Sequence, residues 1–234
     1  MKGLQIGHLE QSMDYKISKA STKFRYGMSD PNQLEDWLRA ENVIGVSMIG
    51  RSNVGKSSSI NSLFGNKTAN ISKTPGRTRE INIFEFKLEL NGKPVEDGPT
   101  YWLFDLPGYG HAKVSKEMKS HWQKLMHTFF ENAGDDVLML NLQDARHPNQ
   151  DSDKEFKKYL EPYGFNTFMV FNKLDKLKTQ KERSALNKLK PQIYKESDWV
   201  EQVHFVSAEK KTGIPTLETS VVNFLLNQTQ QRSS

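Results

Sequence analysis

The sequence feature that most constrains the fold is a glycine-bracketed loop, GRSNVGKS, at residues 50–57, directly after the apolar run VIGVSMI. The loop satisfies the pattern G-x-x-x-x-G-K-[ST], with a strand expected before it and a helix after it. In this setting the glycines let backbone N–H groups turn toward phosphate oxygens, and the helix adds the positive end of its dipole. Lys56 is expected to reach the β- and γ-phosphates of a nucleotide, and the Ser57 hydroxyl to bind Mg²⁺. The motif predicts a P-loop but does not identify the nucleotide.

The rest of the chain alternates strand-like and helix-like patterns, which predicts an α/β fold. We expect a three-layer P-loop NTPase whose mostly parallel six-stranded sheet has one antiparallel strand and helices on both faces. The sequence ELNGKP at 89–94 places Asn-Gly between two strand-like runs, which indicates a hairpin that makes the second and third strands antiparallel. The expected strands cover 43–49, 81–90, 100–106, 136–142, 167–172 and 202–207, and the expected helices cover 56–64, 116–131, 151–160, 180–195 and 215–227.

These patterns indicate one domain with a segment added at each end. We assign the main domain to 42–228, an N-terminal extension that packs on it or precedes it to 1–41, and a polar tail to 229–234. Within the extension, Asp30 can cap a short helix that has Pro31 at its first position.

Composition excludes several kinds of site. The chain has no cysteine, which rules out disulfides, thiol nucleophiles and thiolate metal sites. It has no apolar run of about 18 residues and no apolar N-terminal core, so we expect no membrane span, no signal peptide and a cytoplasmic location. The net charge of +5, from 33 Lys and Arg against 28 Asp and Glu, fits a phosphate-bearing partner such as RNA.

Two motifs at the ends of later strands predict guanine as the base. NKLD at 172–175 supplies Asp175, whose carboxylate can accept hydrogen bonds from both N1–H and the N2 amino group of guanine, whereas adenine lacks that donor pair. Asn172 and the stem of Lys173 would brace the loop and cover the base. VSAEK at 206–210 places the Ser207-Ala208 turn where a backbone N–H can reach the guanine O6.

The motif DLPG at 105–108 completes the set. It supplies Asp105 for the outer coordination sphere of Mg²⁺ and Gly108 for a γ-phosphate contact. Because each motif closes a strand at what should be one edge of a doubly wound sheet, all of them are expected to face one ligand. Together they predict a GTP site, and they predict that the domain at 42–228 is a Ras-like G domain.

Four blocks of sequence resemble the signature of the EngB (YihA/YsxC) family, bacterial GTPases of the TrmE-Era-EngA-YihA-Septin-like class. The blocks are GRSNVGKSS, SKTPGRTREIN at 72–82, DLPGYGHAKVSKE at 105–117 and DARHPNQDSD at 144–153, and the resemblance runs from about 43 to 226. It implies GTP and Mg²⁺ as ligands, a precursor of the large ribosomal subunit (rRNA and ribosomal proteins) as partner, and a link to cell division and septation.

The resemblance also implies roles for single residues. Thr78 would be the switch-I threonine that closes over γ-phosphate and Mg²⁺, with Thr74 as the alternative. The chain has Asn172 where typical members have threonine, and Ser207-Ala208 where they have Ser-Ser; both changes move toward the general GTPase pattern.

The predicted site can be stated in full. The catalytic candidates are Lys56, Thr78 and Asn53, and the metal candidates are Ser57, Thr78 and Asp105 for Mg²⁺ and Asn53 for K⁺. The predicted nucleotide-binding residues are Gly50, Arg51, Ser52, Asn53, Val54, Gly55, Lys56, Ser57, Ser58, Gly76, Arg77, Thr78, Arg79, Glu80, Asp105, Leu106, Pro107, Gly108, Asn172, Lys173, Leu174, Asp175, Val206, Ser207 and Ala208.

Hydrolysis is expected to be slow, because Tyr109 follows DLPG where many GTPases have a glutamine that orients the attacking water. GTPases with a hydrophobic or aromatic replacement there include several with asparagine at the position of Asn53, and these use a bound K⁺ in place of an arginine finger. The alternative is that Asn53 only braces its own loop. At the level of function, the alternative to ribosome assembly is a GTP-dependent switch for a protein partner in cell division. We expect a monomer.

Overall fold

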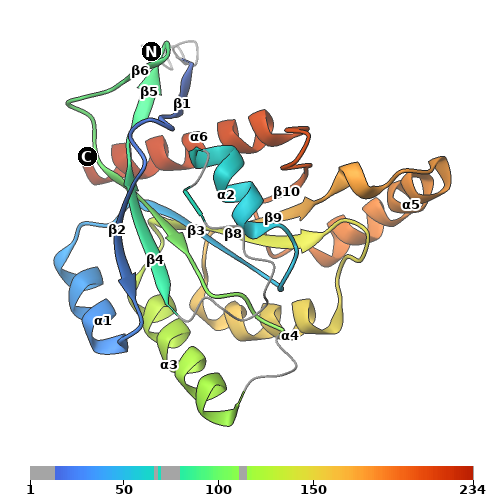
Figure 1. Ribbon diagram of the computed structural model, residues 1–234, viewed down its shortest axis with the longest axis horizontal. Coiled ribbons are helices and arrows are strands. Elements are labelled where there is room, and N and C mark those ends of the chain that lie inside the picture. Colours follow the sequence, from blue (N-terminus) through green and yellow to red (C-terminus); the bar gives the residue numbers. More distant parts are fainter. Residues whose placement is uncertain (1–13, 66–67, 70–79, 111–114, 234) are drawn as a thin grey trace, which may run out of the picture.

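The computed structural model describes residues 14–65, 68–69, 80–110 and 115–233 (Figure 1). Within these residues the chain forms a seven-stranded sheet, a three-stranded sheet and helices on both faces of the larger one. The strands are β1 Tyr15–Ile17, β2 Lys23–Met28, β3 Gly45–Gly50, β4 Ile81–Phe86, β5 Leu88–Leu90, β6 Lys93–Pro94, β7 Tyr101–Asp105, β8 Val137–Asp144, β9 Thr167–Asn172 and β10 Gln202–Phe205. The helices are α1 Pro31–Ala40, α2 Lys56–Phe64, α3 Lys116–Asn132, α4 Asp151–Leu160, α5 Gln180–Glu196 and α6 Ile214–Ser233, with 3₁₀ turns at Glu161–Tyr163 and Leu174–Lys176.

The larger sheet has the strand order β10-β9-β8-β3-β7-β4-β2. Strands β10, β9, β8, β3 and β7 are parallel, and β4 runs antiparallel to both of its neighbours. The register pairs Met48 with Asp105, and Asp144 with Asn172, so the carboxyl ends of the parallel strands meet at one edge. This is the edge at which open α/β sheets bind ligands.

Two features of the sheets differ from the sequence prediction. The sheet has seven strands rather than six, because β2 pairs with β4 from within 1–41. The expected strand 81–90 is interrupted at Lys87, after which β5 pairs with β1 and β6 in the smaller sheet. The N-terminal segment therefore supplies one strand to each sheet.

The helices form two layers because neighbouring side chains of a strand point to opposite faces. On β8, Leu140 packs into a core with α2 and α6, whereas Met139 packs into a second core with α1, α3 and α4. Leu186 and Ile193 of α5 pack on Met169, which lies on the Met139 face of the sheet. Figure 1 shows α6 on one side of the sheet and α3 and α4 on the other.

The local signals of the sequence are confirmed. Asp30 caps α1 by accepting from two backbone N–H groups, with Pro31 in the first turn. The turn between β5 and β6 has Asn91 and Gly92 at φ 52° and 75°, as a tight hairpin requires.

The last helix continues beyond its expected end at 227 and reaches Ser233, so most of the segment assigned to a polar tail is helical. Arg232 donates to the carbonyl of Val43 at 2.8 Å and forms an ion pair with Asp136. These contacts anchor the final turn to the main sheet. Among the described residues, none of the helices combines the length and apolar character that crossing a membrane requires.

Candidate functional site

The P-loop joins β3 to α2 in a conformation that depends on its glycines. A Cβ on Gly50 would stand 2.6 Å from the carbonyl oxygen of Leu142. Gly55 has φ 94°, and a Cβ there would stand 2.4 Å from the side-chain nitrogen of Asn172. The first glycine therefore lets the loop approach β8, and the second lets it approach the base-binding motif.

The two charged residues expected around the phosphates lie together. Lys56, at the start of α2, forms an ion pair with Asp105, which ends β7 and is 6% exposed. The lysine ammonium thus lies on the carboxylate, and a phosphate would have to compete for it. Ser57 and Ser58 follow in the first helical turn, half-buried.

Asn172 connects three of the predicted motifs. Its Nδ2 donates to the carbonyl of Val54 in the P-loop at 3.0 Å, and its Oδ1 accepts from the N–H of Ala208 at 3.0 Å. The side chain is 2% exposed, so both hydrogen bonds are shielded from water. The Ala208 N–H, a candidate for the guanine O6, is already used by this bond.

Asp175 has its carboxylate oriented by neighbours on both sides. Ser207 donates to Oδ1 at 2.7 Å, and Lys176 pairs with Oδ2 at 3.1 Å. Burial acts to raise the pKa of Asp175, but the hydrogen bonds from Ser207 and Lys176 outweigh it and leave that pKa below its ordinary value. The group is therefore an anionic acceptor at neutral pH, as guanine recognition requires. Next to it, the N–H of Leu174 donates to the carbonyl of Val206 at 3.1 Å.

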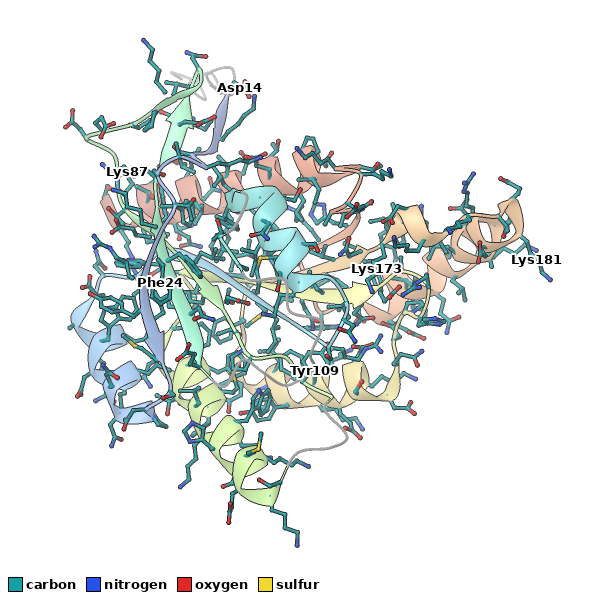
Figure 2. All side chains as sticks on the ribbon, in the orientation of Figure 1. Asp14, Phe24, Lys87, Tyr109, Lys173 and Lys181 are labelled. Carbon is teal, nitrogen blue, oxygen red and sulfur yellow. The ribbon has the colours of Figure 1, made fainter. Side chains whose placement is uncertain are left out.

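Lys173 links the base end of the site to the P-loop. It has φ 71°, and its ammonium donates to the carbonyl of Asn53 and pairs with Asp144 at 3.1 Å. Burial acts to raise the pKa of Asp144, but hydrogen bonds from Arg146 and Lys173 lower it to about 2. In Figure 2 Lys173 lies near the ends of β8 and β9. The role of Asp144 was not predicted, although DARHP begins with it.

The segment after β7 packs directly on the P-loop. A Cβ on Gly108 would stand 2.7 Å from the carbonyl oxygen of Gly50. Leu106 and Pro107 are buried, and the Pro107 carbonyl accepts from the indole of Trp122 at 3.2 Å. DLPG is therefore in contact with the P-loop on one side and with α3 on the other.

Tyr109 points into the protein interior beside α4 (Figure 2). Its ring stacks on Phe156 at 4.3 Å, and its hydroxyl donates to Asp153 at 3.0 Å. The side chain is 6% exposed, and burial raises the pKa of its hydroxyl well above the ordinary value. In this position the phenol does not take the place of a water-orienting glutamine.

Asp153 is a residue of the site that the sequence did not predict. Arg51, from the P-loop, donates to it at 2.8 Å and to the carbonyl of His147 at 3.1 Å. Burial raises the pKa of Asp153, and the Arg51 guanidinium offsets this only in part. The one available signal was the block DARHPNQDSD, which resembles the family but carries no stated chemistry.

Five of the predicted residues around the phosphates are not among the described residues, and Glu80 lies against a different strand. Gly76, Arg77, Thr78 and Arg79 fall outside the described residues, as does Thr74. Glu80 precedes β4, and its carboxyl lies against Gly27 of β2. A Cβ added to Gly27 would stand 2.8 Å from the carboxyl carbon of Glu80.

Asn53 lies in the P-loop with φ 64° and an exposed side chain. Among the residues that the structure describes, that side chain has no hydrogen-bond partner. The loop-bracing bond that was the alternative to a K⁺ ligand is therefore not formed within this part of the chain.

Comparison with known proteins identifies the family of the chain. Residues 45–173 match the family described as "50S ribosome-binding GTPase". The "Probable GTP-binding protein EngB" of Koribacter versatilis is 36% identical over 193 residues, which cover 82% of this chain and 88% of that protein. The protein of the same description from Campylobacter lari is 38% identical over 181 residues, covering 76% and 83%.

Solved structures agree on the fold. Era in complex with MgGDPNP and a segment of 16S ribosomal RNA superposes with a TM-score of 0.61 at 25% identity, covering 78% of this chain and 56% of the Era chain. A crystal structure of "a probable GTP-binding protein engB" gives a TM-score of 0.54 at 23% identity, covering 78% of this chain and 99% of that one. The matches to the EngB proteins extend over most of both sequences, and the chain belongs to the EngB family of GTP-binding proteins and is a GTPase.

Proposed function

We propose that this GTPase is a nucleotide-dependent switch in assembly of the large ribosomal subunit, with rRNA and ribosomal proteins of the precursor as partner. In this proposal it acts in the cytoplasm as a monomer, and normal cell division and septation depend on it. The family description, "50S ribosome-binding GTPase", and the EngB relatives support the choice of partner.

The observation that carries the proposal is the hydrogen bond from Trp122 to the carbonyl of Pro107 at 3.2 Å. It ties the γ-phosphate motif DLPG to α3. On both sides of Trp122 in the sequence, the N-terminal half of this helix bears a basic surface over a shallow hollow of about 460 Å³, lined by Lys116, Glu117, Ser120, His121 and Lys124. A displacement of DLPG by γ-phosphate would therefore also move side chains suited to RNA phosphates.

The residues present fit Mg²⁺ bound together with the nucleotide. Ser57 and Asp105 offer the oxygen ligands that Mg²⁺ prefers, and Thr78 would add another. Within the described part of the chain, no group of three or more acidic or histidine side chains could hold a metal alone. This suits an ion that takes its remaining ligands from phosphates and water. When bound, Mg²⁺ would neutralise charge on the β- and γ-phosphates.

In the proposed site Asp175 reads the base, the P-loop amides and Lys56 hold the phosphates, and Thr78 closes over the γ-phosphate. Turnover is slow because Tyr109 is held in the interior, and Asn53 supplies a ligand for a K⁺ that stabilises charge on the leaving group. GTP turnover measured in KCl and in NaCl tests the last role. We expect faster turnover in KCl, with the difference abolished by Asn53→Ala; equal rates in the two salts would remove K⁺ from the mechanism.

Co-sedimentation with large-subunit precursors tests the partner. We expect binding with a non-hydrolysable GTP analogue but not with GDP, weaker binding at high salt, and a several-fold loss in a Lys116→Gln/Lys124→Gln variant. Lys93→Gln is the matched control, because Lys93 is an exposed lysine on the distant β6. Absence of any ribosomal association would favour the alternative function, a GTP-dependent switch for a protein partner in cell division.

A further inference from the structure

A buried polar cluster connects the P-loop, the segment after DLPG, β8 and α4. Asp153, in the first turn of α4, accepts from Arg51 of the P-loop at 2.8 Å and from the Tyr109 hydroxyl at 3.0 Å. Asn141 of β8 lies 3.2 Å from the same hydroxyl. The Asp153 side chain is 1% exposed and Asn141 is 1% exposed. We call these four residues the Asp153 cluster.

The hydrogen bonds of the cluster converge on the carboxylate of Asp153. Oδ1 of Asp153 accepts from Arg51 and Tyr109, and Oδ2 accepts from the N–H of Gln150 at 2.9 Å, which forms half of the capping box of α4. The phenol has a single proton, and it is donated to the carboxylate. Among the described residues, Nδ2 of Asn141 is buried without a hydrogen-bond partner, and rotating this amide by a half-turn would direct Nδ2 at the phenol oxygen.

Helix α4 holds Tyr109 by both polar and apolar contacts. The Tyr109 ring stacks on Phe156 of α4 with an interplanar angle of 6°. Its backbone forms a bridge with Arg51, and its N–H lies 3.4 Å from the Gly50 carbonyl. The residue after DLPG therefore cannot leave the P-loop without breaking a buried hydrogen bond to α4 or pulling on that helix. Breaking a bond to a buried charged group is costly, so the two positions of Tyr109 should be discrete.

Arg51 extends the cluster to the surface. It donates to Asp153 and to the carbonyl of His147, so it is oriented toward the loop before α4. His147 itself is exposed. The P-loop, the segment after DLPG and the loop at 145–150 thus share one carboxylate as their common acceptor.

We propose that Asp153 is a positioning residue that couples the nucleotide state at Gly108 and Tyr109 to the N-terminus of α4 and the loop at 145–150. The Tyr109–Asp153 bond has a different strength in the GDP-bound and GTP-bound forms, and the surface at 145–150 changes with it. By reciprocity, a partner that binds this surface changes the relative affinity for the two nucleotides. This inference rests on the proposed nucleotide switch.

The test is the ratio of the dissociation constants for GDP and a non-hydrolysable GTP analogue, measured on the full chain. Tyr109→Phe removes the hydroxyl and keeps the ring on Phe156, and Asp153→Asn removes the charge. We expect each change to shift the ratio by about tenfold, the effect of one charge-assisted hydrogen bond, and the double variant to shift it no further than the larger single change. Tyr159→Phe, also on α4, is the matched control and should leave the ratio unchanged.

The outcomes separate this inference from the proposed switch. An unchanged ratio in Tyr109→Phe, with both affinities lowered equally or not at all, overturns the coupling, and this variant decides the matter if Asp153→Asn fails to fold. Trp122 fluorescence in the wild type, corrected with Trp122→Phe, reports on DLPG independently through the bond to Pro107. If that signal is the same with GDP and with the GTP analogue, the switch itself is wrong; if it differs while the ratios stay constant, only the coupling is wrong.

Discussion

The two ends of the nucleotide site are held by different kinds of contact. At the base end, the buried Asn172 side chain forms hydrogen bonds with backbone groups of Val54 and Ala208, and the Ser207 hydroxyl donates to the carboxylate of Asp175. At the phosphate end, Lys56 and Asp105 form an ion pair in which each partner is also a predicted ligand of phosphate or metal. The bonds from Asn172 to Val54 and from Ser207 to Asp175 can remain in place when a nucleotide binds, whereas the Lys56–Asp105 pair has to rearrange for either partner to reach phosphate or metal.

This difference indicates how the protein can combine specificity with switching. A base pocket made before the ligand arrives loses little conformational entropy on binding, so its hydrogen bonds contribute to discrimination. A phosphate site built from the Lys56–Asp105 ion pair and the Tyr109–Asp153 bond can take more than one discrete arrangement, because each of these contacts can be exchanged for another. The contrast predicts that substitutions at the base end alter which nucleotide binds, and that substitutions at the phosphate end alter how the protein responds to it.

The largest effect is expected for Asp175→Asn. Guanine would then lose a charged acceptor for two donors, and GTP affinity should fall by about 100-fold or more. Because an amide can donate as well as accept, xanthosine nucleotides should bind better to this variant than GTP does. Titration with GTP, GDP, XDP and ATP measures both effects. Binding of ATP by the wild type as tight as that of GTP would refute the assignment of Asp175.

A smaller loss of nucleotide affinity is expected for Asn172→Ala, because the Asn172 side chain joins the base end of the site to the P-loop. It leaves the Val54 carbonyl and the Ala208 N–H unpaired in a buried place, at a cost of about 1–3 kcal/mol for each group. Urea unfolding should show lower stability without nucleotide, and GDP and GTP affinities should fall together. Asn166→Ala, which removes an exposed hydrogen bond to the Asp135 carbonyl, is the matched control. A change in nucleotide affinity with no loss of stability would contradict the bracing role.

A weaker effect is expected for Lys173→Met, which keeps an apolar stem over the base and removes the ammonium from Asn53 and Asp144. Losing one charge-assisted bond to the P-loop carbonyl should weaken both nucleotides by about tenfold. Lys176→Met, which removes an exposed partner of Asp175, should have less effect. Isothermal titration of the two variants compares them; equal losses would show that the contact with the P-loop is unimportant.

The smallest effect concerns pH. Because the pKa of Asp144 is lowered to about 2 in the folded protein, its contribution to stability is present above its ordinary value of 3.8 and is lost as pH falls toward 2. Asp144→Asn should reduce the free energy of unfolding by only on the order of 1 kcal/mol at pH 6, because the Arg146 partner is partly solvated. The reduction should be smaller at pH 3. Urea denaturation of both proteins at the two pH values measures this. If the difference in the free energy of unfolding between the two proteins is larger at pH 3 than at pH 6, the expected direction of the pH effect is wrong.

The strand ends of the base site could be predicted because each motif is local. NKLD, VSAEK and DLPG each follow a short apolar run, and parallel strands bring such ends to one edge. The structure confirms this placement for Asn172, Asp175 and Ser207. The role of Asp144 and the contact between Arg51 and Asp153 could not be predicted for the opposite reason, since Arg51 and Asp153 are 102 positions apart and no local pattern relates them.

The seventh strand and the end of α6 show the same limit in the fold. Strand β2 has an almost fully exposed sequence, KFRYGM, and only pairing with β4 makes it a strand. The last turns of α6 are polar, and long-range bonds hold them, from Thr229 to Tyr101 and from Arg232 to Val43.

By itself, the sequence determined the P-loop, the guanine-specific motifs, the caps and the alternation of strands and helices, because propensity, periodicity and motif spacing act over a few residues. Only the tertiary structure decided that the N-terminal segment completes the sheet, that Lys56 pairs with Asp105, and that one buried carboxylate joins Arg51 to Tyr109. Such contacts depend on which groups from distant parts of the sequence are buried together, and this is determined only when the helices pack on the sheet.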